Sequence, residues 1–336
     1  MNKYIFAFIS IFLLSVSTSA QLADTTRTYI DSSLTILRNH SLYSKKVNWN
    51  KIEKQIYAKA ATAKNNTEIF DALKIAFNAV GDKHAAYYSY NDQYKIEDLE
   101  LNARFTDSLR AALAKGPRVL NKMIGDVAYI NIPFMGVQKQ AQIDELANLV
   151  NNSIAALLKN NPKGWIIDLR LNAGGNIRPM LGGLAPFFKN GIVTYYIDRN
   201  GKAEEPSSFL DGDFYIDGIK QANINSKATT LAAAKVAVLI GPGTASSAEG
   251  VANVFHQRGN SKLFGEKSAG RANSTNGFVF NKNQSYFLIS TSFLGDKNKK
   301  ALPEYVMPDE LVVQNNSFND LAEDNAVKAA IKWLKK

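Results

Sequence analysis

The chain has 336 residues, a net charge of +10 at neutral pH, three histidines and no cysteine. The lack of cysteine excludes a disulfide framework and a lipid-modified cysteine. The lysines are scattered rather than gathered into a basic block with interleaved aromatics, so we expect no nucleic-acid partner. Without HxxxH or CxxC spacing the three histidines predict no metal site, and we expect no cofactor.

The first twenty residues have the pattern of a cleavable signal peptide. Lys3 supplies the basic end, residues 5–16 are almost entirely apolar, and small residues at 18–20 precede the expected cut. The apolar run is too short to span a bilayer, which takes about 20 residues. We therefore expect an exported protein, periplasmic or extracellular, whose mature chain begins at Gln21 and has no stable membrane insertion.

Residues 21–115 are predicted to form an N-terminal helical region. Apolar residues recur at helical spacing between residues 22 and 80. Gly81 and Asp82 then end the last helix just before His84. A polar stretch over 91–115 follows, to which the sequence assigns no element.

Residues 116–336 are predicted to form the core. Buried strands alternate with helices here, which is the pattern of an α/β fold. A polar and acidic segment, 196–228, is expected to interrupt this layer, and whether it acts as a lid stays open. The expected strands are 127–132, 164–171, 235–241, about 278–280 and 286–293, and the expected helices are 139–159, 179–188, 247–255 and 326–336.

Ser246 lies where a buried strand turns into a helix. A serine at such a turn has an exposed hydroxyl, and the free amides of the first helical turn lie beside it. Those amides could stabilise an oxyanion, as in a nucleophile elbow, although GxSxG is absent. Serine is also an ordinary helix N-cap, so this position alone does not decide between catalysis and structure.

Two adjacent glycines, Gly174 and Gly175, follow the strand that ends in DLRL. Glycines at this point let backbone amides approach a ligand without side chains in the way. Either glycine could therefore supply a second oxyanion donor. The structural alternative is a tight turn in which Asp168 and Arg170 pair for stability.

His84 is the best candidate for a base that activates a serine, because the pKa of histidine lies near 6.5. His40 belongs to a polar helix of the N-terminal region, and His256 lies near the far end of the helix that begins after Ser246. Both are more simply explained as solvated or hydrogen-bonded histidines.

Four motifs occur in order: DLRLNAGG, VAVLIGPGTASSAE, FGEKSAGRA, and PD near the end of the chain. This order resembles the tail-specific, or C-terminal processing, serine peptidases over about residues 45–335. The resemblance implies a crotonase-like and Clp-protease-like core, a spiral of β-β-α units, with a small N-terminal helical lead-in. Only residues 85–124 separate the lead-in from the core, which is too few for the PDZ domain of many members.

The resemblance also implies roles for individual residues. Ser246, three positions before Glu249, corresponds to the nucleophile. The family's general-base lysine corresponds to Arg271, and arginine stays protonated, so it cannot act as a base. Lys267, four positions earlier, is an alternative base, but no other motif of the family lies beside it.

A second branch, similar to the tricorn core protease, uses a histidine in a GDxH context, which GDKH matches at His84. In this branch Glu304 corresponds to the acidic residue that orients the histidine, with Asp309 and then Asp82 as alternatives. The oxyanion hole would be formed by the amides of Ser247 and of Gly174 or Gly175. Those two glycines stay alternatives.

The sequence predicts a serine peptidase that hydrolyses peptide bonds of peptides or unfolded proteins through an acyl-enzyme. Two alternatives stay open. The first is a catalytically inactive protein of the same fold that binds peptides or another ligand, which the missing base lysine favours. The second is an esterase or amidase for small substrates, because it would use the same nucleophile and oxyanion donors. The oligomeric state is unknown.

Overall fold

The computed structural model describes residues 23–336, so the predicted signal peptide lies outside the described residues. Within the described part, no helix is both long and apolar enough to cross a membrane. The helices are α1 Asp24–His40, α2 Trp49–Ala60, α3 Asn66–Val80, α4 Leu99–Ala103, α5 Asp107–Ala114, α6 Gln140–Leu158, α7 Ile177–Leu184, α8 Ser247–Gln257 and α9 Asn325–Leu334, with short 3₁₀ turns at Ser44–Lys46 and Ala185–Phe187.

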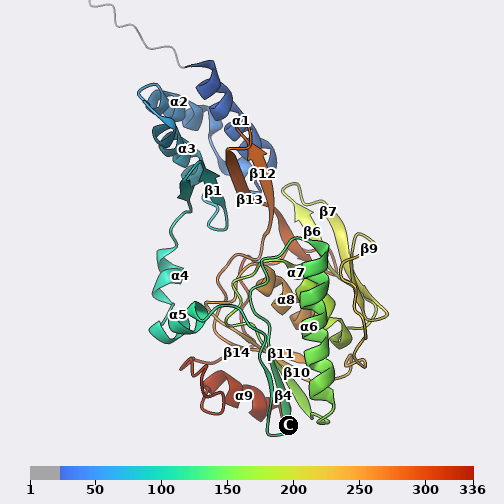
Figure 1. Cartoon of the computed structure of the whole chain (residues 1–336). Coiled ribbons are helices and arrows are strands. Elements are labelled where there is room, and N and C mark those ends of the chain that lie inside the picture. The colour runs from blue at the N-terminus through green and yellow to red at the C-terminus, as the bar shows by residue number, and fades with distance from the viewer. Residues whose placement is uncertain (1–22) are drawn as a thin grey trace, which may run out of the picture.

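The strands form two sheets (Figure 1). They are β1 Ala86–Ser89, β2 Asp92–Tyr94, β3 Asn121–Ile124, β4 Val127–Asn131, β5 Gly164–Asp168, β6 Gly191–Asp198, β7 Ala203–Leu210, β8 Asp213–Ile216, β9 Ile219–Lys220, β10 Val236–Ile240, β11 Ser261–Gly265, β12 Ser274–Phe280, β13 Ser285–Asp296 and β14 Glu310–Leu311.

The first sheet has six strands in the order β14-β11-β10-β5-β4-β3, all parallel except β3. Every residue of β4, β5 and β10 is buried, as expected for parallel strands covered on both faces. Helices α6, α7 and α8 pack on one face and α9 packs on the other. The carboxyl ends of the parallel strands therefore meet at one edge, where ligand sites of α/β sheets usually lie.

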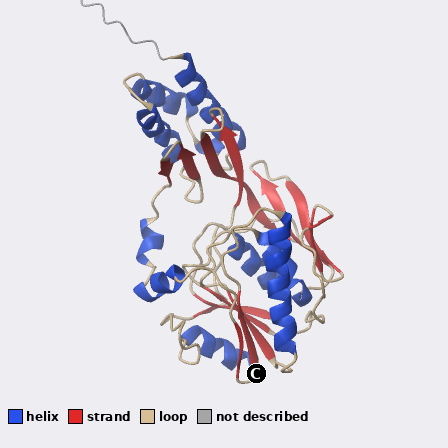
Figure 2. Cartoon of the chain, viewed as in Figure 1, coloured by secondary structure: helices blue, strands red, loops and turns tan. Residues whose placement is uncertain are grey.

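The second sheet joins the N-terminal region to the core. Its order is β2-β1-β13-β6-β7-β8-β9, and β12 also pairs with β13. One half of the long strand β13 pairs with β1 and the other half pairs with β6. The helices α1, α2 and α3 pack on β1, β12 and β13 through one apolar cluster (Figure 2). This upper layer therefore combines residues 24–89 with residues 274–296, whereas the C-terminal helix α9 packs on the six-stranded sheet.

Several segments differ from the sequence prediction. The polar segment 196–228 contains the antiparallel strands β7, β8 and β9. In β7, buried positions alternate with exposed ones near its end, so a largely polar sequence can still form a strand. The polar stretch 91–115 contains β2 and the short helices α4 and α5. Five further strands were also not predicted, namely β1, β3, β6, β11 and β14. The boundary at residue 115 between the N-terminal region and the core stays a prediction.

Candidate active site

The loops that follow β5, β10 and β11 meet at the carboxyl edge of the six-stranded sheet. The three strands are adjacent and parallel, so their ends lie side by side. The loop after β5 contains Gly174 and Gly175, the loop after β10 leads to Ser246, and the loop after β11 leads to Arg271. Residues nearly 100 positions apart are thereby brought to one site.

Ser246 occupies a strained position immediately before α8. Its φ of 55° and ψ of −122° are unusual for a residue with a side chain. Such a conformation costs about 1–3 kcal/mol and persists only where its surroundings hold it. The Ser246 N–H donates to Oε2 of Glu249 at 2.7 Å, which fixes the turn.

Glu249 connects the nucleophile turn to the loop after β11. Its carboxylate is fully buried and accepts hydrogen bonds from the Ser268 hydroxyl, the Gly270 N–H at 2.8 Å and the Arg271 N–H at 2.9 Å, in addition to Ser246. Burial raises the pKa of Glu249 to about 7, and the four hydrogen bonds oppose this by favouring the carboxylate. The positions of Ser246 and Arg271 therefore depend on the same side chain.

Gly174 lies directly against Ser246. A Cβ atom on Gly174 would be 2.6 Å from Cβ of Ser246, and its φ of +102° also favours glycine. The Gly174 N–H donates to Oδ1 of Asn172 at 2.8 Å, so it is already used. The stabilising ion pair that the sequence suggests for this turn is also formed, because Arg170 pairs with Asp168 and with Asp324 in the buried core.

Gly175 and Ser247 offer backbone amides beside Ser246. The carbonyl of Gly175 accepts a hydrogen bond from the Ser247 hydroxyl at 2.7 Å, which joins the two loops. Met135 holds the Gly175 loop on its other side through two backbone hydrogen bonds. The Met135 N–H donates to the Gly174 carbonyl, and the Met135 carbonyl accepts from the Asn176 N–H. Within residues 23–336, the N–H groups of Gly175 and Ser247 have no acceptor.

His84 comes from the upper layer, in the loop between α3 and β1. The backbone N–H of His84 donates to Oδ1 of Asp82 at 2.9 Å. The buried Asp82 carboxylate also accepts from the backbone N–H of Ser290 at 2.8 Å and from the Ser290 hydroxyl at 3.1 Å. Asp82 therefore fixes the histidine loop to β13. Burial and then the charge of Arg271 lower the pKa of His84 to about 4, so the imidazole is neutral at pH 7.

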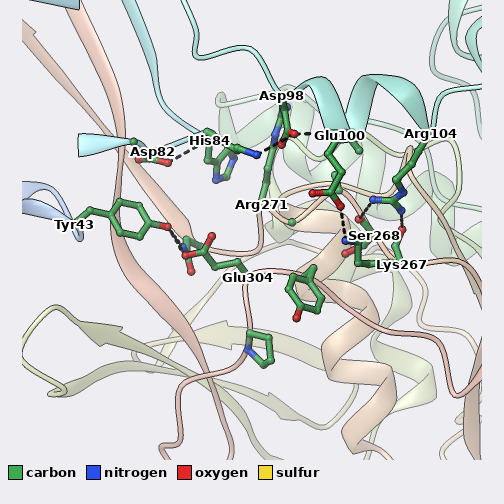
Figure 3. Close-up of a pocket in the computed structure, with 18 of the residues that line it drawn as sticks. Tyr43, Asp82, His84, Asp98, Glu100, Arg104, Lys267, Ser268, Arg271 and Glu304 are labelled. Atoms are coloured by element: carbon green, nitrogen blue, oxygen red, sulfur yellow. Dashed lines mark hydrogen bonds and ion pairs between the residues drawn. The ribbon is translucent and has the colours of Figure 1, made fainter. Parts of the chain in front are cut away.

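His84 lines a cavity of about 540 Å³ between the upper layer and the core. Figure 3 shows His84 and Arg271 on one side of this cavity and Glu304 with Tyr43 on another. Nδ1 of His84 has no hydrogen-bond partner in the described part of the chain. No hydrogen bond between Ser246 and His84 is formed there either, and Ser246 is not among the residues that line this cavity. Ser268 and Gly270 do line it, and both donate to Glu249, which also accepts from the Ser246 N–H.

The structure brings Glu304, but not Asp309, to the cavity of His84. Oε1 of Glu304 accepts a hydrogen bond from the Tyr43 hydroxyl at 2.6 Å, and that hydroxyl accepts one from Nδ2 of Asn273 at 2.6 Å. Burial raises the pKa of Tyr43, which keeps this donor protonated. Asp309 instead bonds Nε2 of His256 at 2.9 Å.

The segment around α4 closes one side of the cavity and was not identified from the sequence. Arg104 donates to the carbonyls of Lys267 and Ser268 in the loop after β11. Nζ of Lys267 pairs with Glu100 at 2.8 Å. Neither this segment nor Tyr43 carries a local sequence signal, because each contact joins parts of the chain far apart in sequence.

Comparisons with known proteins agree with this architecture. The family model described as Peptidase family S41 matches residues 126–312. The nisin-resistance protein of Lactococcus lactis subsp. lactis is 28% identical over 309 residues, which cover 91% of this chain and 86% of that protein.

Solved structures share the fold at lower identity. A lipoprotein from Streptococcus agalactiae has a TM-score of 0.67 and 22% identity, covering 97% of this chain and 99% of that chain. The photosystem II D1 C-terminal processing protease has a TM-score of 0.57 and 11% identity, covering 91% and 97%. The predicted fold class, an α/β core preceded by helices, is thereby confirmed.

Proposed function

Because this chain belongs to peptidase family S41, we propose that it is a serine peptidase in which Ser246 is the nucleophile and His84 the general base. The observation that carries the proposal is the strained backbone of Ser246, fixed by Glu249 next to two unpaired amides. Strain of this kind clusters at functional sites. An ordinary N-cap serine would need neither the positive φ nor the adjacent glycine loop.

The proposed reaction passes through an acyl-enzyme. His84 takes the proton from the Ser246 hydroxyl while Oγ attacks the scissile carbonyl carbon, and the N–H groups of Ser247 and Gly175 stabilise the oxyanion. His84 then gives its proton to the leaving amine nitrogen. Water, deprotonated by His84, attacks the acyl carbon. As the bond between that carbon and Oγ breaks, His84 returns the proton to Oγ of Ser246 and the acid is released. Gly175 is preferred over Gly174 because the Gly174 N–H is bonded to Asn172.

Glu304 is proposed to stabilise the imidazolium that forms during the reaction. Its charge raises the pKa of His84, although burial and Arg271 act more strongly in the opposite direction. Tyr43 and Asn273 hold Glu304 in the cavity wall. Hydrogen bonds between catalytic groups are often long without substrate, so we expect the bond between His84 and Ser246 to form when a peptide is bound.

The substrate is proposed to be a peptide or an unfolded protein outside the cytoplasm. The signal-peptide pattern of residues 1–20 supports export. The names of two relatives, a lipoprotein and a nisin-resistance protein, fit a cell-envelope location, and nisin is one substrate to test.

An inactive peptide-binding protein is the second candidate. The observation that favours it is the missing hydrogen bond between Ser246 and His84 in the described residues. It predicts saturable peptide binding without turnover.

Hydrolysis of a set of synthetic peptides, nisin and aryl esters, followed by mass spectrometry, tests the proposal. The wild type should cleave peptides, and Ser246→Ala should reduce kcat/KM about 1000-fold or more. Ser226→Ala, at an exposed serine that does not line the cavity, is the matched control and should keep full activity. Cleavage of esters alone would identify an esterase, and equal peptide cleavage by Ser246→Ala would overturn the proposal.

A further inference from the structure

The guanidinium of Arg271 lies in the cavity without a partner. Its Nε is buried and has no hydrogen-bond partner within residues 23–336, and none of its nitrogens forms an ion pair there. Its backbone is nevertheless held firmly, because the Arg271 N–H donates to Glu249. A fixed arginine with an unsatisfied buried N–H is costly unless something else binds it.

Most of the other cations that line the cavity are engaged. Nζ of Lys83 pairs with Asp98 at 3.0 Å, and Lys267 pairs with Glu100. Arg104 donates to loop carbonyls. Arg271 differs from these three because it also lies close enough to His84 for its charge to lower the pKa of the imidazole, after the larger effect of burial.

The carboxylates that line the cavity are engaged as well. Oδ1 of Asp98 accepts from Lys83 and from the Leu101 N–H, Asp82 is bonded to Ser290 and His84, and Glu304 is bonded to Tyr43. No acidic side chain of residues 23–336 forms an ion pair with Arg271, although the charge of Arg271 helps to lower the pKa of Asp98, after the effects of Lys83 and of the Leu101 N–H. An anionic group that enters the cavity would find a free guanidinium.

We propose that Arg271 binds a carboxylate of the peptide substrate and so determines which peptides are cut. This inference rests on the proposed peptidase function. The planar guanidinium matches a carboxylate in geometry and charge. Arg271 lines one cavity with His84, the proposed base, and its N–H shares the Glu249 carboxylate with the Ser246 N–H, so we expect the carboxylate to lie within a few residues of the scissile bond. It is either the C-terminal carboxylate of a short tail or the side chain of Asp or Glu.

Paired synthetic peptides distinguish these two sources. Each sequence is made with a free C-terminal carboxylate and with a C-terminal amide, and with Glu or Gln near the cleavage point. We expect the wild type to prefer one carboxylate form about tenfold or more in kcat/KM, as for a charge-assisted hydrogen bond. A preference for free acid over amide identifies the C-terminus, and a preference for Glu over Gln identifies a side chain.

Variants of the cavity test the role of Arg271. Arg271→Gln should abolish the preference mainly through KM while it still cleaves the neutral peptide, and Arg271→Lys should keep part of the preference. Lys267→Gln removes a charge from the same loop and should leave the preference unchanged. Asp98→Asn removes a carboxylate from the cavity wall but keeps a side chain that can cap α4. It should therefore leave the preference for the carboxylate peptide intact or increase it.

Binding of the same peptides to Ser246→Ala, measured by calorimetry, separates the two hypotheses. If the wild type cleaves nothing but Ser246→Ala binds the carboxylate peptide more tightly through Arg271, the peptidase proposal fails, whereas carboxylate binding by Arg271 is upheld as a property of a binding protein. If the wild type cleaves both members of every pair equally, or Arg271→Gln lowers all rates by the same factor, the inference is wrong and the peptidase proposal stands.

Discussion

The nucleophile turn and the histidine loop are positioned in different ways. Ser246 follows a fully buried strand of a parallel sheet, and its conformation is fixed within a few residues by Glu249. His84 lies in the upper layer, and its loop is fixed through Asp82 to Ser290, about 200 residues later in the chain. The nucleophile therefore depends on local structure, and the base depends on how two layers meet.

The two regions also differ in the contacts that hold them in place. The loops around Ser246 are joined by hydrogen bonds between Ser247 and Gly175 and between Glu249 and the Gly270 N–H. The upper layer contacts the core through β13 and through the α4 segment around the cavity. Substitutions in the two regions should therefore have different effects on stability and on catalysis.

Gly174→Ala should have the largest effect, because it breaks the local geometry of the core. The new Cβ would lie 2.6 Å from Cβ of Ser246, so the nucleophile must move. A displacement of about 1 Å can cost about 100-fold in rate, and the backbone strain should lower the free energy of unfolding by about 1–3 kcal/mol. Steady-state kinetics and urea unfolding measure both.

Gly201→Ala is the matched control for this substitution. Gly201 has a similar φ of +85°, but a Cβ there meets no atom within 4 Å. It should lose stability through strain and keep full activity. Normal activity of Gly174→Ala would show that this glycine does not determine the position of Ser246.

Asp82→Asn should have an intermediate effect, because it loosens the histidine loop and leaves the core unchanged. The variant places an amide N–H against the donating N–H of Ser290, which should lower the free energy of unfolding by about 1–3 kcal/mol. We expect kcat to fall about tenfold to 100-fold as His84 is displaced.

Asp296→Asn is a suitable comparison. Asp296 also accepts two backbone N–H bonds, at 2.8 Å each, but lies at the far end of β13. Both N–H groups donate to Oδ1, which asparagine keeps, so this variant should retain kcat and lose little stability. If Asp82→Asn behaves in the same way, Asp82 does not position the base.

The pH dependence should show the smallest effect. A general base must be neutral, and the pKa of His84 is lowered to about 4. Activity in the free enzyme should therefore be retained well below pH 6.5 and be lost as the pH falls through about 4. Arg271→Gln removes a positive charge that disfavours the imidazolium, so the pKa of His84 should rise and the acid limb of kcat/KM should move to higher pH.

Lys267→Gln is the control for this profile, because Lys267 is paired with Glu100. Its acid limb should coincide with that of the wild type. An acid limb that does not move in Arg271→Gln would mean that His84 is not the titrating base.

The contrast between local structure around Ser246 and long-range contacts in the upper layer also determines how much could be predicted from the sequence. The strand, turn and helix around Ser246 and the glycines at 174 and 175 have local patterns, so their positions were predicted. The contact between Tyr43 and Glu304 joins residues 261 positions apart, and no local pattern indicates it. The antiparallel strands β7 to β9 were missed because their exposed face makes the sequence polar.

The central claim is that His84 activates Ser246, and covalent labelling tests it most directly. The protein is treated with a fluorophosphonate, and the modified residue and the labelling rate are determined by mass spectrometry. The account predicts one adduct, on the peptide that contains Ser246, which is absent in Ser246→Ala and forms far more slowly in His84→Ala. Labelling of Ser246 at the same rate in His84→Ala and in the wild type would contradict it.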